Sequence, residues 1–582
     1  MRAIIIDGYV DEPACFGVPP YVSPYVRYCA GALYANGWDV DYTTCDRWRS
    51  AKDEYTERIV SFEIVLVIMG LTVPGRYRGG SPLTMRELDE IAETKSRSRG
   101  KGVLILGGPI RWGYTLRGGR RAEDLIPEGV DLIATGDVEM SLDIFCRTKE
   151  WITDARRSYE WLDGQPDFPS LGAAIVKSHP SYPNLIAEME LSRGCDRVTS
   201  TGRGCSYCAE AMSGGYAERS EDGVTREAKA LDEAGIRAFR LGRAANILAY
   251  GGTKTDRGFA PNSGRLESLY SGIRGAAKNL SILHTDNCNP ATIARFSEES
   301  ARCLEVIVRH NTEGDGLSLG LENLDPAVRE ANNLKVSYDE ALEAVRIINE
   351  IGASRRTPRS MPSLLPGPNF LFGLAGESGP GLAWNTKFLE TLLEERLCVR
   401  RINIRRAITF SGVPLSSVLS ENPSKLRERD YRRWKEWVRG VVDPIMLERV
   451  APDGVILKDV IIESREGHVA FGRQLGSYPP LVGIVSAIAA GECVDVMVTG
   501  RGGRSLTGVR YPLDINTASR VELEALPGIG RARAEHLLSL VPYGSLSELG
   551  NTLDAMDAPG LCGKLMPYFK STEAHGLTRP HL

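Results

Sequence analysis

The chain has 582 residues, of which 42% are hydrophobic and 25% charged, and its formal net charge is -4. At roughly 100–200 residues per domain, this length predicts several domains of ordinary globular composition. The charge balance gives no global sign of a nucleic-acid partner, and no apolar run approaches the roughly 18 residues of a membrane-spanning helix. The first residues form an apolar run ending in Asp7-Gly8, which is typical of a buried strand rather than a signal peptide. We therefore expect a cytoplasmic protein.

Residues 1–150 alternate between apolar runs and helical patterns. Strand-like runs cover residues 2–6, 40–44, 64–71, 102–106 and 130–134, with helical segments such as 25–37 and 84–99 between them. Fully apolar strands separated by helices favour a parallel, doubly wound, Rossmann-like sheet. Loops rich in glycine or proline follow the strands, at the sheet edge where this architecture binds ligands. These loops favour a large ligand, although glycines also serve tight turns alone.

A linker over residues 151–184 precedes a second alternating region, residues 185–415. Expected strands cover 186–191, 238–241, 281–285, 316–321, 369–372 and 401–404, and expected helices cover 223–234, 265–278, 290–303, 325–332, 337–351 and 385–396. This repeat predicts a full or partial (β/α) barrel, with a second open sheet as the alternative.

The C-terminal third predicts three further parts. Residues 416–453 are charged and helical in pattern, which favours a solvated connector. Short apolar stretches separated by turn residues predict a small antiparallel β-barrel over 454–511. Residues 512–582 contain Pro527-Gly528-Ile529-Gly530 in a helix-hairpin-helix context, and end in a polar tail. The hairpin turn exposes backbone N–H groups that suit a phosphate, but such hairpins also dock on proteins, so nucleic acid is not favoured.

Three of the twelve cysteines, Cys195, Cys205 and Cys208, fall within fourteen residues, and the others are too dispersed for a disulfide scaffold. Cys205 and Cys208 can face one metal centre, and Cys195 can complete a three-point attachment. Zinc usually takes four protein ligands, and no histidine follows at a finger-like spacing. A redox dithiol would leave Cys195 unexplained. Three thiolates suit an iron–sulfur cluster with one open iron.

The segment from Glu190 through Ser192-Arg193-Gly194 to Cys195, followed by Cys205-Ser206-Tyr207-Cys208 and the strand–helix repeat, resembles the radical S-adenosylmethionine (AdoMet) superfamily. The resemblance implies a 4Fe–4S cluster on the three cysteines and AdoMet on its open iron. Nine residues separate the first two cysteines here, where the family usually has three. Tyr207 occupies the family's aromatic position beside adenine.

Later segments resemble the strand ends that bind AdoMet in that superfamily, although the usual Gly-Gly-Glu is absent from the second. The implied AdoMet-binding residues are Tyr207, Gly242, Arg243, Asn287, Glu322, Asn323, Phe372 and Gly373. In this chemistry a reduced cluster cleaves AdoMet, and the resulting 5′-deoxyadenosyl radical abstracts hydrogen from an unactivated carbon.

The domain before the barrel resembles the cobalamin-binding module of one large subfamily. The implied cobalamin-binding residues are Pro20, Tyr21, Gly70, Leu71, Thr72, Gly107, Gly108, Pro109, Gly136, Asp137 and Glu139. Residues 1–178 contain no histidine, so this domain cannot supply a histidine ligand to cobalt, and the subfamily usually lacks one. Two alternatives are an empty domain and a methylthiotransferase arrangement, which would need a second cluster on Cys15, Cys29 and Cys45.

Together these resemblances imply a cobalamin-dependent radical AdoMet methyltransferase with a C-terminal helix-hairpin-helix. The chain is similar to a methanogen group that C-methylates the α-carbon of a glutamine in methyl-coenzyme M reductase. The implied partners are the reductase α subunit and an electron donor such as ferredoxin or flavodoxin; the resemblance assigns no catalytic residue. The alternatives are a tRNA-modifying methylthiotransferase-like enzyme and a nucleic-acid-binding protein with a structural iron–sulfur cluster.

Overall fold

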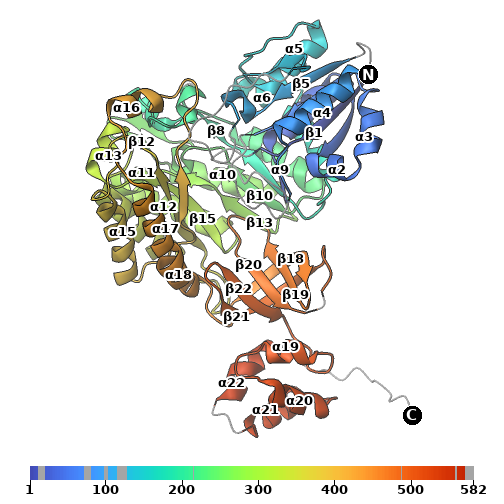
Figure 1. Ribbon diagram of the computed structural model, residues 1–582, viewed down its shortest axis with the longest axis vertical. Coiled ribbons are helices and arrows are strands. Elements are labelled where there is room, and N and C mark those ends of the chain that lie inside the picture. Colours follow the sequence, from blue (N-terminus) through green and yellow to red (C-terminus); the bar gives the residue numbers. More distant parts are fainter. Residues whose placement is uncertain are drawn as a thin grey trace. The chain divides into compact units, whose positions relative to one another are not determined.

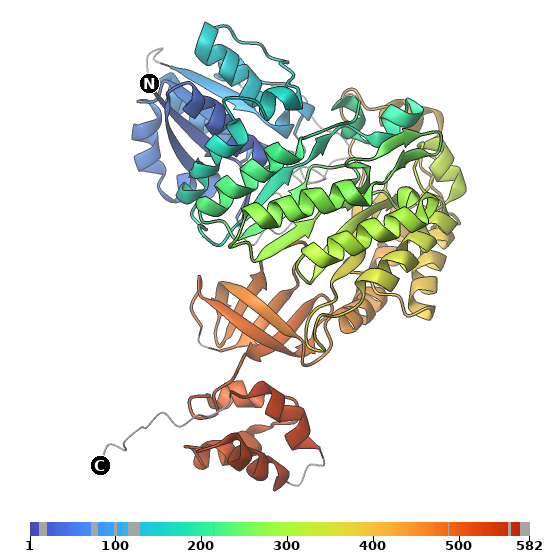
Figure 2. The ribbon, with the colours of Figure 1, turned by 180° about the vertical axis from the view of Figure 1, so that it is seen from behind.

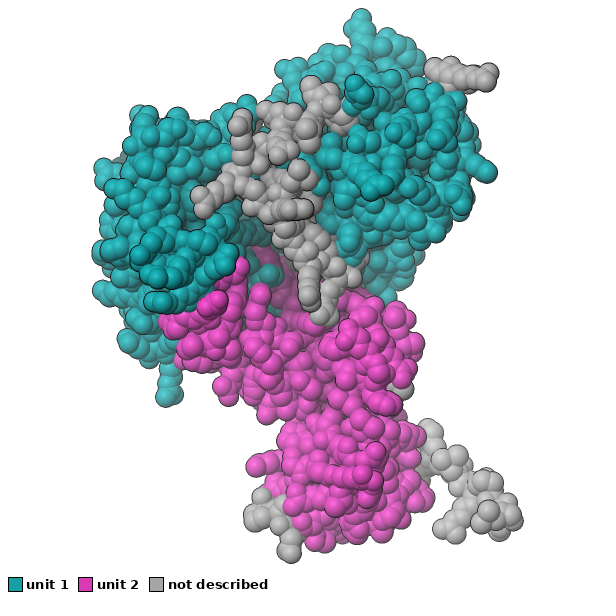
Figure 3. All heavy atoms as spheres, in the orientation of Figure 1, with its two compact units in different colours: residues 1–353, 364–434 teal, residues 354–363, 435–582 magenta. Residues whose placement is uncertain are grey.

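The structure is a computed structural model that describes residues 1–10, 20–70, 80–97, 102–114, 128–213, 215–486, 488–556 and 560–570. The chain forms two compact units (Figure 3). Unit 1 comprises residues 1–353 and 364–434, and unit 2 comprises residues 354–363 and 435–582. Figures 1 and 2 show the elements of both units from opposite sides.

Unit 1 begins with a parallel sheet in the order β3-β1-β4-β5-β6. Its strands are β1 (Arg2–Asp7), β3 (Asp39–Thr44), β4 (Ile64–Ile68), β5 (Val103–Gly107) and β6 (Leu132–Ile133). One face packs on α1 (Pro24–Ala35) and α5 (Val138–Thr148), and the other on α2 (Cys45–Ser50), α3 (Lys52–Ile59) and α4 (Met85–Ser96). Ala3 and Ile5 lie in the first core and Ile4 and Ile6 in the second, as expected for strands covered on both faces.

Two parallel four-stranded sheets follow, in the orders β13-β10-β7-β2 and β14-β15-β16-β17. The strands are β2 (Tyr21–Val22), β7 (Ile186–Glu190), β10 (Ala238–Gly242), β13 (Ile282–Thr285), β14 (Asn287–Cys288), β15 (Asp315–Glu322), β16 (Leu364–Phe372) and β17 (Asn403–Arg406). A single residue, Asp286, separates β13 from β14, so the two sheets continue one another as a partial (β/α) barrel.

Helices connect the barrel strands and cover them from outside (Figure 2). They are α9 (Glu221–Glu233), α10 (Ser263–Ala276), α11 (Pro290–Arg295), α12 (Ser297–His310), α13 (Pro326–Ala331), α14 (Tyr338–Gly352) and α15 (Leu382–Glu394). The single helix expected over 290–303 is two helices, because Phe296 leaves the helical conformation at φ -124°. The carboxylates of Glu298 and Glu299 then favour a new helix start.

The segment around Pro20 and Tyr21 differs from its expected place in a ligand loop of the first sheet. Tyr21 pairs with Ile186 as strand β2 of the barrel sheet, and the carbonyl oxygen of Pro20 accepts a hydrogen bond from the amide of Ile186 at 2.8 Å. The Tyr21 side chain is buried, and its hydroxyl donates to Glu188. Edge pairing with β7 therefore holds this segment on the barrel.

Unit 2 contains a closed five-stranded barrel in the order β18-β19-β20-β22-β21. The strands are β18 (Ile456–Glu466), β19 (Val469–Gln474), β20 (Leu481–Val485), β21 (Cys493–Arg501) and β22 (Ser505–Arg510). The expectation of a purely antiparallel barrel was wrong, because β20 and β22 pair in parallel. Strand β18 covers two apolar stretches, Ile456–Leu457 and Val460–Ile462, and its register shifts between Leu457 and Val460.

The remaining helices are α16 (Leu415–Glu421) and α17 (Glu428–Trp437) in the connector, then α18 (Asp443–Val450), α19 (Arg520–Glu524), α20 (Arg531–Ser539), α21 (Leu546–Asp554) and α22 (Leu561–Leu565). Within the described ranges, none of the helices combines the length and apolar composition needed to cross a membrane.

Close backbone packing joins α1 to the short helix α7 (Phe168–Gly172). A Cβ atom at Gly31 of α1 would lie 2.0 Å from the carbonyl oxygen of Phe168.

We predict that Gly31→Ala lowers the free energy of unfolding of unit 1 by about 1–3 kcal/mol, because the helices must separate. Urea denaturation followed by circular dichroism measures it. Gly275→Ala in α10, where a Cβ meets nothing within 4 Å, is the helical control and should lose nothing; equal losses would contradict the close packing.

Candidate active site

The three cysteines lie on the loop that follows β7. The short strand β8 (Ser192–Arg193) pairs with β9 (Ala217–Glu218), and Gly194 turns the chain with φ 77°. Cys195 then caps α8 (Asp196–Thr201), which ends at Gly202 in the left-handed conformation. The nine residues between Cys195 and Cys205 thus include a helix, and the chain turns back after it at Gly202.

Two asparagines of the barrel hold the returning segment in place. The backbone amide of Ser206 donates to the carbonyl oxygen of Asn332 at 3.0 Å, and the Ser206 hydroxyl donates to Asn332 Oδ1 at 3.0 Å. Asn333 Nδ2 donates to the carbonyl oxygen of Gly204 at 2.8 Å. Nothing in the sequence linked these asparagines, which follow α13, to the cysteine motif.

The thiols of the three cysteines influence one another electrostatically. Burial, and then the charge of Cys205, raises the pKa of Cys208 to about 12, with a smaller contribution from Cys195. Burial and Glu322 raise the pKa of Cys205 to about 11, against the opposing charges of Lys335 and Arg197. The three thiols are therefore close enough to affect one another's pKa, and a cluster held by all three stays a prediction.

The three cysteines of this loop differ in how well they suit a single metal ion and an iron–sulfur cluster. Across the described part of the chain, no three or more histidine, cysteine or carboxylate side chains gather around a point that would hold one metal ion. In an iron–sulfur cluster the thiolates bind separate irons, so their sulfur atoms stand farther apart than the ligands of a single ion. Three half-buried cysteines on one loop fit that arrangement.

Glu322, at the end of β15, places an unsatisfied carboxylate beside the cysteines. Its side chain is buried, and its Oε2 atom has no hydrogen-bond partner. Burial raises the pKa of Glu322, opposed by Lys335 and by a hydrogen bond from Tyr207. A Cβ atom at Gly320 would lie 2.6 Å from Glu322 Oε1 and 3.0 Å from Lys335 Nζ, so the glycine leaves room for both groups. An orphan acceptor of this kind suits a ligand hydroxyl or ammonium group.

Asn323 and Gly373 meet at a second carboxylate. Glu377 Oε2 accepts hydrogen bonds from the backbone amide of Gly373 at 2.9 Å and from Ser424 Oγ at 3.1 Å, and Glu377 also bonds the Asn323 side chain. This contact ties the end of β16 to the residue after Glu322. Phe372 instead packs on Tyr431 and Trp434 of α17, with ring centroids 5.0 and 5.1 Å away.

Asn287 lies next to a group of buried charges inside the barrel. Its Nδ2 atom donates to Asp286 Oδ2 at 3.1 Å. Asp286 pairs with Arg240 of β10, which lies 3.4 Å from Glu188 Oε1 of β7. Burial raises the pKa of Asp286 to about 7, with Arg240 opposing. The sequence did not single out this group, because its members come from three separate strands.

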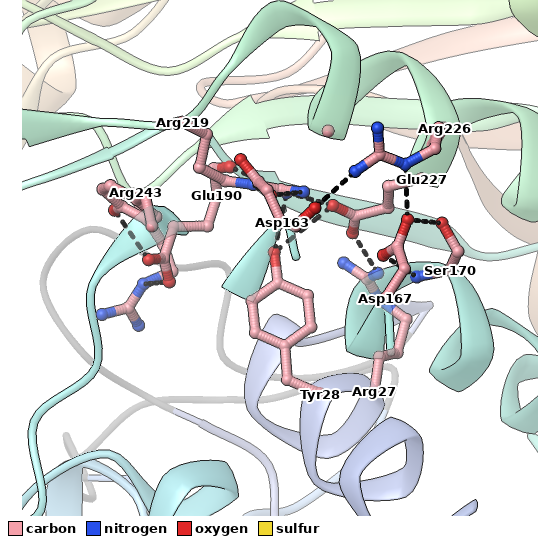
Figure 4. A network of polar contacts seen from close by, with 12 residues as sticks. Arg27, Tyr28, Asp163, Asp167, Ser170, Glu190, Arg219, Arg226, Glu227 and Arg243 are labelled. Atoms are coloured by element: carbon pink, nitrogen blue, oxygen red, sulfur yellow. Dashed lines mark hydrogen bonds and ion pairs between the residues drawn. The ribbon is translucent and has the colours of Figure 1, made fainter. Parts of the chain in front are cut away.

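Gly242 and Arg243 adjoin a network centred on Glu190 (Figure 4). Arg243 Nε lies 3.2 Å from Glu190 Oε2, and its guanidinium lies over the Tyr25 ring, 4.5 Å from the centroid. A Cβ atom at Gly242 would lie 2.1 Å from Glu188 Oε1. Both residues thus have contacts within the protein at the end of β10.

The carboxylate of Glu190 also meets two further arginines. Arg157 Nη2 lies 2.8 Å and Arg193 Nη2 3.5 Å from its Oε1 atom. Burial alone would raise the pKa of Glu190, but the charges of Arg157, Arg193 and Arg243 hold it well below its usual range. Beside this group, Arg27 of α1 pairs with Glu227 of α9, which also pairs with Arg219 (Figure 4). The first sheet and the barrel are therefore joined by buried ion pairs.

The acidic residues expected to contact cobalamin are part of this junction. Asp137 Oδ2 accepts a hydrogen bond from the Arg157 amide at 2.9 Å and lies 2.7 Å from Arg193 Nη1. Glu139 pairs with Arg157. Both carboxylates are buried and neutralised within the protein.

The glycines of the same loops are explained by close packing. A Cβ atom would lie 2.6 Å from Val138 at Gly107, 2.6 Å from the Met69 carbonyl oxygen at Gly108, and 2.1 Å from the Ala155 carbonyl oxygen at Gly136. Gly70 donates its amide to Tyr9, and Pro109 begins a short 3₁₀ helix. Leu71 and Thr72 lie outside the described residues. None of these contacts indicates a cobalamin site, so cobalamin binding by this domain stays a prediction.

The cysteines considered for a second cluster are separated. Cys29 lies in the core on the α1 face of the first sheet, and Cys45 lies in the core on the opposite face. Cys15 lies outside the described residues. The sheet itself stands between Cys29 and Cys45, which opposes the methylthiotransferase alternative.

Two archaeal proteins define the family of this chain. The uncharacterized protein MJ0274 of Methanocaldococcus jannaschii is 38% identical over 518 residues, which cover 87% of this chain and 93% of that protein. An uncharacterized protein of Archaeoglobus fulgidus is 35% identical over 556 residues, covering 94% and 97%. The chain belongs to the family that these proteins represent. No protein-family model matches the chain.

Two of the solved structures to which this chain is similar are described as S-adenosylmethionine radical enzymes. The radical S-adenosylmethionine methyltransferase TsrM of Kitasatospora setae matches with a TM-score of 0.44 and 14% identity, covering 72% of this chain and 76% of that one. The cobalamin-dependent enzyme OxsB matches with a TM-score of 0.46 and 11% identity, covering 72% and 55%. At these scores and identities the likeness carries no argument about activity.

We predict that Glu190→Gln destabilises unit 1 by about 3–5 kcal/mol, because the buried guanidinium of Arg157 and the partly buried guanidinium groups of Arg193 and Arg243 lose their shared carboxylate. Thermal and urea denaturation measure the loss. Glu233→Gln removes an exposed carboxylate that pairs with Lys229 on the surface of α9, and should change stability by less than about 0.5 kcal/mol. Equal effects of the two variants would contradict a structural role for Glu190.

Proposed function

We propose that this protein is a radical AdoMet enzyme that acts on an unactivated carbon. The proposal is supported by the position of Cys195, Cys205 and Cys208 on one loop after β7, where their thiols influence one another electrostatically, and by the unpartnered buried oxygen of Glu322. When bound, the cluster and AdoMet would supply an electron and the radical chemistry that breaks a carbon–hydrogen bond.

The residues of the chain have separate tasks in this proposal. Cys195, Cys205 and Cys208 would hold the cluster. Glu322 would accept a hydrogen bond from an AdoMet hydroxyl or ammonium group through Oε2, while Tyr207 fixes its carboxyl group. Glu377 would keep the ends of β15 and β16 in register through Asn323 and Gly373. The burial of these groups would keep bulk water from the reacting atoms.

We further propose that the reaction is a methylation that uses cobalamin bound at the first domain. Support comes from the sequence resemblance of that domain rather than from any described contact. The first substrate to test is the glutamine α-carbon of methyl-coenzyme M reductase, with ferredoxin or flavodoxin as electron donor. The helix-hairpin-helix is less suited to nucleic acid, because Arg520 and Arg531 pair with Glu524 and Glu535 of their own helices.

Cys205→Ala should abolish both cluster binding and AdoMet cleavage, because two thiolates cannot hold the cluster with one iron open. Iron and sulfide content and 5′-deoxyadenosine formation are measured after anaerobic reconstitution. Cys493→Ser changes an exposed cysteine of unit 2 and should leave both readouts at the wild-type level. Deoxyadenosine production by Cys205→Ala would refute the site.

The methylation is tested with the anaerobically purified full chain. We expect corrinoid absorption, and a methyl group on a glutamine-containing reductase peptide incubated with AdoMet, methylcobalamin and a reductant, read by mass spectrometry. AdoMet cleavage without corrinoid binding would retain the radical AdoMet assignment and remove cobalamin. A peptide that stays unmodified while AdoMet is cleaved and corrinoid is bound would exclude only this substrate.

A further inference from the structure

The nine residues between Cys195 and Cys205 bring an arginine to the cluster side of the loop. Arg197 is the second residue of α8, and its Nη1 atom lies 3.6 Å from Cys205 Sγ. The guanidinium is fixed on its other side by Asn333, whose Oδ1 atom accepts a hydrogen bond from Nη2 at 2.7 Å. A shorter spacing between the cysteines leaves no room for this helix, so the insertion supplies a cation that touches a cysteine sulfur.

Lys335 brings a second cation to the same cysteines from the barrel. Its ammonium group lies in the space left by Gly320, next to Glu322 Oε1. Burial would lower the pKa of Lys335, but its neighbours, Glu322 foremost, hold it above its usual range. Arg197 and Lys335 also line one cavity of about 390 Å³, to which Arg295 contributes from α11.

The two cations have a definite electrostatic consequence for a cluster held by these cysteines. Reduction adds one negative charge to the cluster, and a fixed positive charge a few ångströms away stabilises that charge. Hydrogen bonds to the ligand sulfurs act in the same direction, and both are recognised controls of cluster potential. Arg197 supplies the contact to sulfur and Lys335 the nearby charge, so both favour the reduced state.

We propose that Arg197 and Lys335 raise the reduction potential of the iron–sulfur cluster that Cys195, Cys205 and Cys208 would hold. The inference rests on the proposed function, since it needs the cluster. The step concerned is the transfer of one electron from a low-potential iron–sulfur or flavin protein to the cluster, with no bond made or broken. The nine-residue spacing between Cys195 and Cys205 then has a function, because the helix within it carries Arg197.

The test is a redox titration of the reconstituted full chain, followed by electron paramagnetic resonance, with dithionite as reductant. We expect Lys335→Met and Arg197→Gln each to move the midpoint potential to more negative values, and the double variant to move it further. Lys335→Arg, which keeps the charge, should stay close to the wild type. Arg295→Gln removes an exposed cation that lines the same cavity and pairs with Glu340, and should not shift the midpoint.

The redox titration distinguishes a failure of this inference from a failure of the proposed function. Loaded variants with wild-type midpoints would overturn the inference and leave the radical AdoMet assignment intact. A wild-type chain that binds no cluster would overturn both. Iron content is measured for every variant, and Lys335→Gln is titrated in place of Lys335→Met where the latter does not retain iron. A shift shared by Arg295→Gln would show a general effect of surface charge and would also overturn the inference.

Discussion

The buried carboxylate of Glu190 is the point on which the arrangement of unit 1 depends. It is the last residue of the first barrel strand, and its ion pairs reach Arg157 of the linker, Arg193 of the cysteine loop and Arg243 after β10. A buried carboxylate is tolerated only with such partners, and the buried guanidinium of Arg157 in turn needs the carboxylate. One side chain therefore fixes the first domain, the start of the cysteine loop and the second strand end together.

The cysteine loop is held by a second set of contacts, and these come from two asparagines that follow α13. Asn332 and Asn333 bond Ser206, Gly204 and Arg197, so the segment that carries Cys205 and Cys208 is fixed by residues more than a hundred positions later. Glu322 and Lys335 approach from the same direction. The surroundings of the three cysteines are thus formed by β15 and the turn after α13.

The first domain shows how a loop motif can have two explanations. Its glycines and acidic residues match a ligand-binding edge, yet Gly108 and Gly136 are needed for close backbone approach, and Asp137 and Glu139 are paired with arginines. The chain belongs to one family with the Methanocaldococcus jannaschii and Archaeoglobus fulgidus proteins, but this relationship does not assign an activity to the chain. Function therefore depends on the chemistry of the residues around the three cysteines.

The sequence alone determined the elements that follow from local pattern. Apolar strands between helices indicated the first sheet and the barrel, and the spacing of Cys195, Cys205 and Cys208 led to the prediction of a shared metal centre. Tertiary structure alone decided that Tyr21 joins the barrel sheet, that β22 closes the second barrel in parallel with β20, and that Lys335 and Glu322 meet beside Cys205. Strand periodicity is a property of neighbouring residues, whereas edge pairing and buried charge depend on residues that only folding brings together.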